Sequence, residues 1–228
     1  MDNQNILIQA HFAELYTKYS GLTLDRLEGT SIVHGLLEFI ASYKGVDTQD
    51  SFHIKLLITK DYHKTPPVAK EIGGRIPKDF HTNPDGSLCL AMPTESRLRF
   101  SQNPTLIGFV EDLLIPYLFS FSYWQKNGVM PYGAFSHGPK GIMEYYLEFF
   151  KIGSESIVLN FLKILVEGHY RGKHKCPCGS GLNIRQCHEK ALLKLNSFQN
   201  QVGFINDFLQ CADYLKEKSD PKWLRRNN

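Results

Sequence analysis

The sequence predicts an α+β fold, with strands early in the chain and helices after them. Residues 30–43 and 51–58 are rich in β-branched and aromatic residues, and the polar stretch between them indicates a break. These two segments predict neighbouring strands of an antiparallel meander. The second half of the chain instead repeats apolar residues at helical spacing. With 228 residues, of which 42% are hydrophobic, the chain is long enough to bury a substantial core.

The elements around these strands follow from local patterns. Apolar residues at helical spacing predict an amphipathic helix over residues 5–20, before the strands. After the strands, residues 62–77 contain two adjacent prolines and two adjacent glycines, which predict an extended, irregular crossing. The following segment SLCLAM, residues 87–92, predicts a short strand or a strand-like segment.

Helices are expected in the rest of the chain. A core helix is predicted from Pro104 to residue 121, with Asn103 as its cap and Pro116 as a kink or an early end. Residues 125–141 contain several glycines and prolines and predict a loop. Further helical segments are predicted over residues 141–150, over residues 154–170 with Ser154 as cap, and over residues 189–218 as one long or two short helices.

Composition limits the classes of protein to which the chain can belong. A formal net charge of +3 is too small to indicate nucleic acid or a membrane surface as a partner. The longest apolar run, residues 113–124, is too short to span a bilayer, and the N-terminus has no signal-peptide pattern. We therefore expect a cytoplasmic protein. Its expected domains are residues 1–150 and a helical C-terminal region, residues 151–228, with a cysteine-rich motif at 174–190.

Clustered cysteines form the most specific motif of the chain. Cys176 and Cys178 lie one residue apart, and Cys187 and His188 follow after eight more residues. Three thiolates and an imidazole fit tetrahedral zinc with no open position, which is typical of a structural site rather than a catalytic one. Glycines between the two pairs allow the chain to turn back sharply. The alternative is a set of incidental buried cysteines.

This stretch resembles the SEC-C zinc motif, which lies at the C-terminus of the preprotein translocase ATPase and is appended to many bacterial proteins. That motif reads C-x-C-G-S-G, then a basic stretch, then C-[CH], and residues 176–188 match every ligand position. The resemblance is confined to this short segment. It implies a zinc-held docking knob and implies no reaction.

A fourth cysteine lies in a different setting, within HTNPDGSLCLAMP, residues 81–93. Cys89 follows a Pro-Asp-Gly turn and stands between two leucines. A nucleophilic thiol needs exposure and a group that lowers its pKa or stabilises its intermediate. The side-chain amide of Asn83 is one such group, because it can donate to a developing oxyanion. From spacing alone, a cysteine between Leu88 and Leu90 is more often a packed core residue.

The order of motifs resembles the ubiquitin-conjugating enzyme family over residues 5–124. The Tyr-Pro-rich crossing, the H-T-N triplet, the sequence G-S-L-C-L and the following helix match that family in order. The resemblance implies a UBC-like fold with an N-terminal helix and a four-stranded meander. It also implies that Cys89 forms a thioester, that Asn83 stabilises the oxyanion when an amine attacks, and that His81 braces the loop.

Several positions depart from that family. Thr82 replaces a proline, only five residues separate Asn83 from Cys89, and no tryptophan follows the cysteine. These departures suggest a divergent bacterial branch. Such proteins accompany ubiquitin-like conjugation systems, including antiphage operons of the CBASS type. The implied partner is a ubiquitin-like protein, or the C-terminus of a cyclic-oligonucleotide synthase, carried on the cysteine and passed to a target.

Two other functions stay open from the sequence. The first is an inert adaptor with the same fold, in which Cys89 is a packing residue. The second is a thiol hydrolase in which Cys89 and His137 form a dyad that removes conjugates. His137 lies in a glycine-rich loop, where a histidine can act as a base or an orienter, although a solvated loop histidine is more common.

Overall fold

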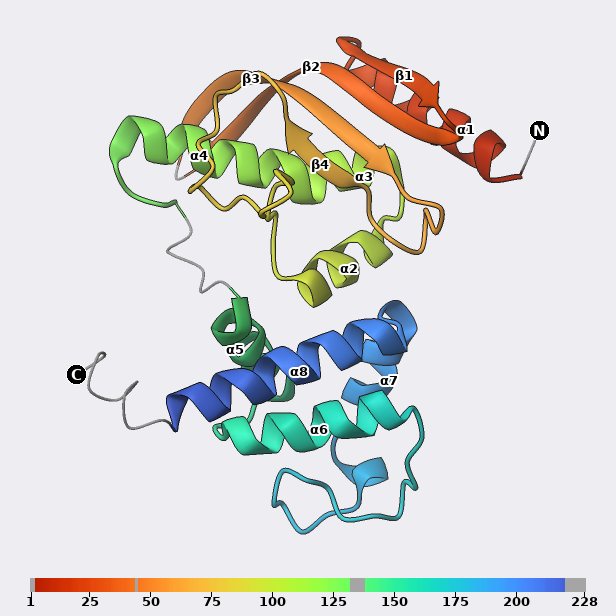
Figure 1. The fold of residues 1–228 in the computed structure, drawn as a ribbon, viewed down its shortest axis with the longest axis vertical. Coiled ribbons are helices and arrows are strands. Elements are labelled where there is room, and N and C mark those ends of the chain that lie inside the picture. The colour runs from red at the N-terminus through yellow and green to blue at the C-terminus, as the bar shows by residue number, and fades with distance from the viewer. Residues whose placement is uncertain (1–2, 44, 132–137, 220–228) are drawn as a thin grey trace. The chain divides into compact units, whose positions relative to one another are not determined.

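The computed structural model describes residues 3–43, 45–131 and 138–219 (Figure 1). The chain divides into two compact units. The first contains Met1–Ala91 and Arg99–Ala134, and the second contains Met92–Leu98 and Phe135–Asn228. The division into domains 1–150 and 151–228 stays a prediction, because a compact unit is not by itself a segment that folds alone.

The first unit combines a helix with a four-stranded sheet, which confirms the α+β prediction. Helix α1 spans Asn3–Lys18, as its apolar periodicity predicts. The strands follow in sequence order, and each pairs antiparallel with its neighbour. They are β1 (Leu22–Leu27), β2 (Thr30–Tyr43), β3 (Val46–Ile58) and β4 (Val68–Glu71).

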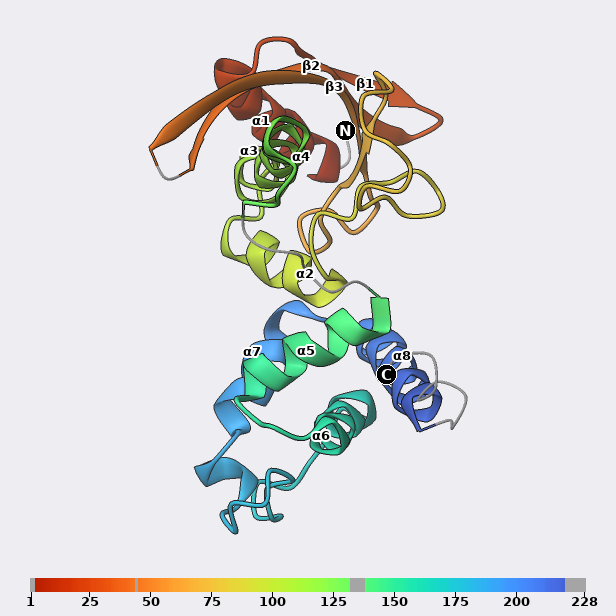
Figure 2. The same cartoon turned by 90° about the vertical axis from the view of Figure 1, so that its left-hand side faces the viewer.

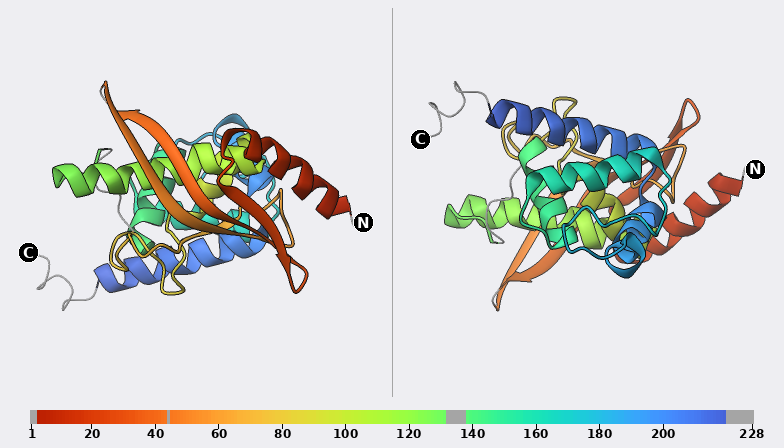
Figure 3. Two further views of the ribbon diagram at one scale, coloured as in Figure 1. Left: turned by 90° about the horizontal axis from the view of Figure 1, so that it is seen from above. Right: turned by 90° about the horizontal axis from the view of Figure 1, so that it is seen from below.

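One face of this sheet covers the helices that follow it (Figure 2). Along β3, Phe52, Ile54, Leu56 and Ile58 alternate with less buried residues, so that every second side chain points into the core. Phe52 meets Phe121 of the long helical run edge-on, with ring centroids 6.0 Å apart. Seen from above in Figure 3, β2 and β3 cross over this helical run.

The long helical run consists of α3 (Leu106–Phe109), a π-helical turn η1 (Val110–Leu114) and α4 (Ile115–Asn127). The predicted cap is wrong by two residues, because Thr105 accepts from the backbone amide of Gly108 at 2.9 Å. Pro116 does not end the run, which continues to Asn127. Proline lacks an amide hydrogen and its ring crowds the preceding turn, and the wider π-turn just before it accommodates both defects.

This helical run is also long and apolar. By length and composition alone, Leu106–Asn127 could cross a membrane, which the shorter apolar run in the sequence did not suggest. The structure buries 61% of its most apolar window. It therefore acts as the central core helix of the first unit, where apolar residues on several faces are expected.

Two elements between β3 and this run were missed by the sequence-based prediction. Strand β4 lies inside the crossing that the sequence predicts to be irregular, and helix α2 spans Pro93–Gln102. SLCLAM is a strand-like segment, the second of the two predicted alternatives, because Leu88 makes only an isolated bridge with Thr82. The helix escaped prediction because its buried side chains include the polar Thr94, which breaks the apolar pattern.

The second unit is helical. Its helices are α5 (Gly138–Phe150), α6 (Glu155–Glu167), the short 3₁₀ turn η2 (Ile184–Gln186), α7 (Glu189–Phe198) and α8 (Gln201–Lys218). The tail therefore forms two helices rather than one, and Asn200 caps the second by accepting from the amide of Gly203. Helix α8 packs against both α5 and α6 (Figure 2). The ring of Phe150 stacks on Phe161 at the centre of this core, with centroids 4.3 Å apart.

Candidate metal centre and candidate active site

The chain between α6 and α7 folds into a tight knuckle. Lys175 and Asn183 form an isolated antiparallel bridge, and the amide of Cys176 donates to the carbonyl of Leu182 at 2.8 Å. Between them, Gly179 and Gly181 have φ values of 81° and 77°. Side chains other than glycine are strained in this left-handed region, so the glycines permit the turn that returns the chain toward its cysteines.

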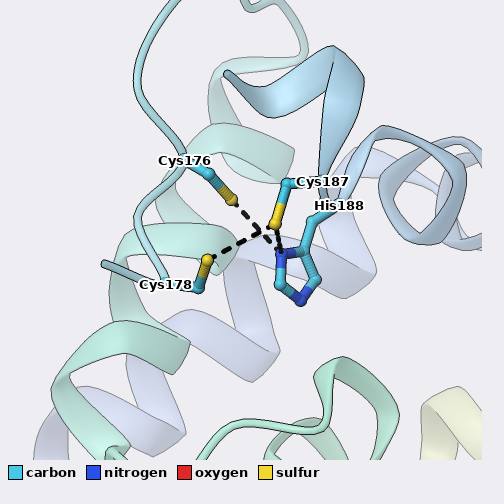
Figure 4. Close-up of side chains that lie close together, drawn as sticks. All are labelled: Cys176, Cys178, Cys187 and His188. Atoms are coloured by element: carbon cyan, nitrogen blue, oxygen red, sulfur yellow. Dashed lines mark hydrogen bonds between the residues drawn. The ribbon is translucent and has the colours of Figure 1, made fainter. Parts of the chain in front are cut away.

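The knuckle brings four ligand atoms together (Figure 4). One ligand atom from each of Cys176, Cys178, Cys187 and His188 lies within 4.8 Å of the others. The Nδ1 atom of His188 is 3.2 Å from the sulfur of Cys176 and 3.1 Å from that of Cys187. The sulfurs of Cys178 and Cys187 are 3.5 Å apart. Tetrahedral zinc with bonds of about 2.3 Å to sulfur sets the sulfurs about 3.8 Å apart, so this group could hold a metal ion after a small expansion.

A backbone carbonyl orients the histidine of this cluster. The Nε2 atom of His188 lies 2.9 Å from the carbonyl oxygen of Phe150 in α5. The imidazole ring also lies against Phe161 of α6, with centroids 4.9 Å apart. A hydrogen bond from the second ring nitrogen is the usual support of a metal-bound histidine. The ring is therefore held with Nδ1 toward the sulfurs.

The thiols of the cluster differ in their surroundings. Burial raises the pKa of Cys176 to about 12. Burial acts in the same direction at Cys178, but hydrogen bonds from Ser180 and from the neighbouring cysteines outweigh it and lower that pKa to about 6. A bound cation would bring all three cysteines to the thiolate form. Cys211 lies apart from the cluster in the core of the second unit, fully buried, and serves as a packing residue.

Cys89 lies at the end of a narrow hairpin in the first unit. Its amide donates to the carbonyl of His81, and the amide of Asn83 donates to the carbonyl of Ser87, both at 2.8 Å. The amide of Gly86 closes the turn onto the carbonyl of Asn83 at 2.9 Å. His81 and Asn83 therefore both lie within the hairpin that carries the cysteine.

Contacts from two other elements fix this hairpin. The amide of Leu88 donates to the carbonyl of Ala69 in β4 at 2.8 Å, and the Leu88 side chain is buried. From α4, the hydroxyl of Tyr117 donates to the carbonyl of Phe80 at 2.9 Å and also lies 3.3 Å from that of His81. The sheet and the central helix thus hold the two ends of the segment that contains Cys89.

The three predicted active-site side chains of the hairpin differ in their contacts. The thiol of Cys89 is half-buried, and burial raises its pKa. The side-chain amide of Asn83 is exposed and donates to Ser87 Oγ at 3.0 Å rather than to the cysteine. The ring of His81 lies edge-on against Phe80, with centroids 4.8 Å apart, and its backbone has a left-handed φ of 44°.

Other residues of the site lie outside the sequence-based prediction or outside the described chain. His137 falls outside the described residues, so its partnership with Cys89 stays a prediction. Sequence reasoning missed Ser87, which contacts Asn83, and Asp85, whose carboxylate accepts from Ser87 Oγ at 2.6 Å. It also missed Tyr117. The turn signal around Asp85 could have suggested the first two, because aspartate in turns often accepts from residues two positions on.

The chain matches no protein-family model, no curated protein and no solved structure. The resemblances to the ubiquitin-conjugating enzymes and to the SEC-C motif therefore depend on the residues named above.

Proposed function

We propose that this protein is a cysteine-dependent acyl carrier of the ubiquitin-conjugating type, with a structural zinc ion in its second unit. Cys89 would accept a protein C-terminus as a thioester and pass it to an amine. The observation that carries the proposal is the hairpin that joins Cys89 to Asn83 and that bonds to β4 through the Leu88 amide and the Ala69 carbonyl. The order of elements around it supports the same conclusion, since an N-terminal helix and a four-stranded antiparallel meander precede it.

The chemistry proceeds in two balanced steps. In the first, the Cys89 thiolate attacks the activated carbonyl of the donor, a new carbon–sulfur bond forms, and the donor's leaving group departs. In the second, an amine attacks the thioester carbonyl, a carbon–nitrogen bond forms, and the cysteine leaves as thiolate and recovers the proton that the amine loses. Both steps pass through a tetrahedral oxyanion, which an amide donor such as that of Asn83 stabilises.

Burial of the cysteine influences both steps. A thiol whose pKa is raised is mostly protonated at neutral pH. Its thiolate is a strong nucleophile once formed, but it is also a poorer leaving group. The transfer step then depends on donors that stabilise the oxyanion. This requirement fits the amide of Asn83 in the same hairpin.

Zinc is proposed for the knuckle because three thiolates and one imidazole are its typical structural ligand set. Cys176, Cys178, Cys187 and His188 would fill all four positions and leave none for a substrate. The knuckle and the terminal helices would then recruit the partner, proposed to be a ubiquitin-like protein or the C-terminus of a cyclic-oligonucleotide synthase. A role in bacterial antiphage defence and a cytoplasmic location are part of this proposal.

Replacement of the thiol by a hydroxyl tests the function. Cys89→Ser is expected to trap an ester-linked adduct, because an oxygen ester resists attack by amines better than a thioester does. The experiment is a pull-down of the full chain from its native host, with mass spectrometry of the adduct, and Cys89→Ala is the matched control that cannot be acylated. If conjugation continues unchanged in Cys89→Ala, the proposal is wrong.

The second candidate is an adaptor with an inert cysteine. Its supporting observation is that burial raises the pKa of the Cys89 thiol. The rate of alkylation by iodoacetamide distinguishes the two functions. An adaptor predicts slow alkylation and an active complex in Cys89→Ala, whereas the carrier predicts loss of all conjugation in that variant.

A further inference from the structure

The hairpin register determines which side chains share a face with Cys89. The hydrogen bond from the backbone amide of Asn83 to the carbonyl of Ser87 sets these two residues opposite each other. Leu88, between Ser87 and Cys89, forms the isolated antiparallel bridge with Thr82, and this local extended pairing places its two neighbours on the opposite face. Asn83 and Cys89 are therefore diagonal neighbours across the hairpin, at a separation of roughly 7–8 Å between backbones that polar side chains can bridge.

The side chains on this face form a directed chain of hydrogen bonds. Asp85 accepts both the amide of Ser87, at 3.0 Å, and its hydroxyl, at 2.6 Å. The Ser87 hydroxyl has one hydrogen, which it donates in a hydrogen bond to the carboxylate. The lone pairs of the same oxygen can therefore accept a hydrogen bond from Asn83 at 3.0 Å. Ser87 is 6% exposed, which limits the other partners that its hydroxyl can find.

This arrangement leaves one amide hydrogen of Asn83 for another acceptor. A carboxamide has two N–H donors, and the bond to Ser87 engages one of them. That bond restricts the rotation of the carboxamide and so narrows the range of directions open to the second N–H. Free rotation of an exposed asparagine would otherwise spread this donor over many directions, at a cost in entropy when it must be held in one.

We propose that Ser87 and Asp85 are positioning residues that aim the second amide hydrogen of Asn83 at the oxyanion formed on the Cys89 thioester. The proposal rests on the function proposed above. Neither residue touches the reacting atoms, and no proton passes along the chain of hydrogen bonds. Their effect is to hold the N–H donor of Asn83 where the negative charge develops. The donor then needs no reorientation during the reaction, which lowers the activation free energy.

Single-turnover discharge of the full, zinc-loaded chain tests the proposal. The acyl donor is a glycine-terminated peptide thioester, the acceptor is free lysine, and peptide mapping confirms acylation at Cys89. Loss of one oxyanion donor typically slows reaction about 10²-fold, which is the effect expected for Asn83→Ala. Ser87→Ala and Asp85→Ala are expected to slow discharge about tenfold, because they misdirect the donor without removing it.

Two further variants separate positioning from general damage to the fold. Ser87→Thr keeps the hydroxyl and is expected to restore most of the rate lost in Ser87→Ala. The double variant Asn83→Ala, Ser87→Ala is expected to be no slower than Asn83→Ala alone, since an absent donor cannot be misdirected. Asp79→Ala, which removes an exposed carboxylate outside the hairpin, is the matched control for Asp85→Ala.

The outcomes distinguish this proposal from the function on which it rests. The positioning role is wrong if Ser87→Ala discharges at the wild-type rate while Asn83→Ala is slow. It is also wrong if the rate loss of the double variant equals the product of the two single rate losses. If Asn83→Ala itself discharges at the wild-type rate, the positioning role is overturned while Cys89 is still the acyl carrier. If Cys89 takes up no acyl group, the proposed function and the positioning role are both overturned.

Discussion

The Nε2 nitrogen of His188 donates to the backbone carbonyl of Phe150 across 2.9 Å, and this bond decides which ring nitrogen faces the three cysteines. A neutral imidazole carries a single proton, so a donor at Nε2 leaves a lone pair at Nδ1. The end of α5 thus selects the tautomer that can bind a metal ion. Helix α5 therefore orients the histidine of the four-residue group, although it contributes no ligand itself.

Removal of the metal is expected to destabilise the second unit, because binding of a structural ion is coupled to folding. Cys178→Ser should abolish stoichiometric zinc and lower the thermal midpoint by about 10 °C, as a loss of several kcal/mol implies. Elemental analysis and thermal unfolding check this. Cys211→Ala is the control, since it removes a buried cysteine outside the cluster and should keep the metal. Wild-type protein that contains no metal after mild purification would refute the site.

A buried carboxylate in the second unit supports a second prediction. Thr94, Tyr146 and Gln199 all donate to one oxygen of Asp207, which is 2% exposed. Asp207→Ala removes the shared acceptor of the buried Thr94 and Tyr146 hydroxyls, while Gln199 keeps its bond to the Thr94 hydroxyl oxygen at 2.8 Å. This variant is expected to cost about 2–4 kcal/mol of unfolding free energy. Tyr146→Phe removes one donor only and should cost about 1 kcal/mol. Urea unfolding measures both, and equal losses would contradict the role of the carboxylate.

The same carboxylate predicts a pH dependence. Burial raises the pKa of Asp207 above its ordinary value of 3.8. The folded protein therefore holds this proton more tightly than the unfolded chain does, and stability falls as the pH rises from about 3.8 to the raised pKa. Asp207→Asn does not titrate, so the fall should be smaller in this variant. If the unfolding free energies of the wild type and of Asp207→Asn changed equally with pH, Asp207 would not be the cause of the fall.

For Asp50 of β3 the opposite pH dependence of stability is predicted. Burial alone would raise its pKa, but hydrogen bonds from Arg75, Ser122 and the amide of Ser51 outweigh it and lower the pKa to about 2. Stability from this group is therefore complete above pH 3.8 and is lost as the pH falls toward 2. Because the Arg75 side chain is 37% exposed and solvent screens its ion pair, Arg75→Met is expected to cost about 1 kcal/mol at pH 7 and to reduce the acid sensitivity. Acid titration of unfolding checks both, and an unaltered acid limb in Arg75→Met would contradict the assignment.

The hydroxyl of Tyr117 is predicted to limit access to the cysteine. It donates to the carbonyl of Phe80 at the base of the hairpin, which also accepts from the Thr82 hydroxyl at 2.9 Å. Tyr117→Phe removes one of these two hydrogen bonds, at a cost of about 1 kcal/mol. The hairpin should then open more often, and iodoacetamide should alkylate Cys89 several times faster. Tyr123→Phe, on the same helix, is the control. An unchanged alkylation rate in Tyr117→Phe would show that the hydroxyl does not hold the hairpin.

Elements that bury an apolar face could be predicted from the sequence. Helix α1 and strands β2 and β3 repeat apolar residues at periods that match their structure. Strand β4 could not, because its four residues lie in a proline- and glycine-rich segment and pair only through partners distant in sequence. Helix α2 was missed for a related reason: Thr94, on its buried side, is satisfied by Asp207, which no local pattern reveals.

The candidate site divides in the same way. The four ligands of the metal cluster lie within one short segment, so their spacing carried the prediction. The supporting carbonyl of Phe150 has no signature in the sequence, because every residue has a carbonyl. The role of Ser87 depends on the hairpin register, and that of Tyr117 depends on a helix that packs against the hairpin from a distant part of the chain.

The π-turn at Val110–Leu114 restricts the number of residues that this part of the helical run can have. It holds one residue more than an α-helical turn, and each residue rotates a helix by about 100°. Deletion of one residue there would turn α4 so that Tyr117 left the carbonyl of Phe80 and Phe121 left Phe52. Relatives of this protein should therefore tolerate substitutions in the turn far better than a change in its residue count.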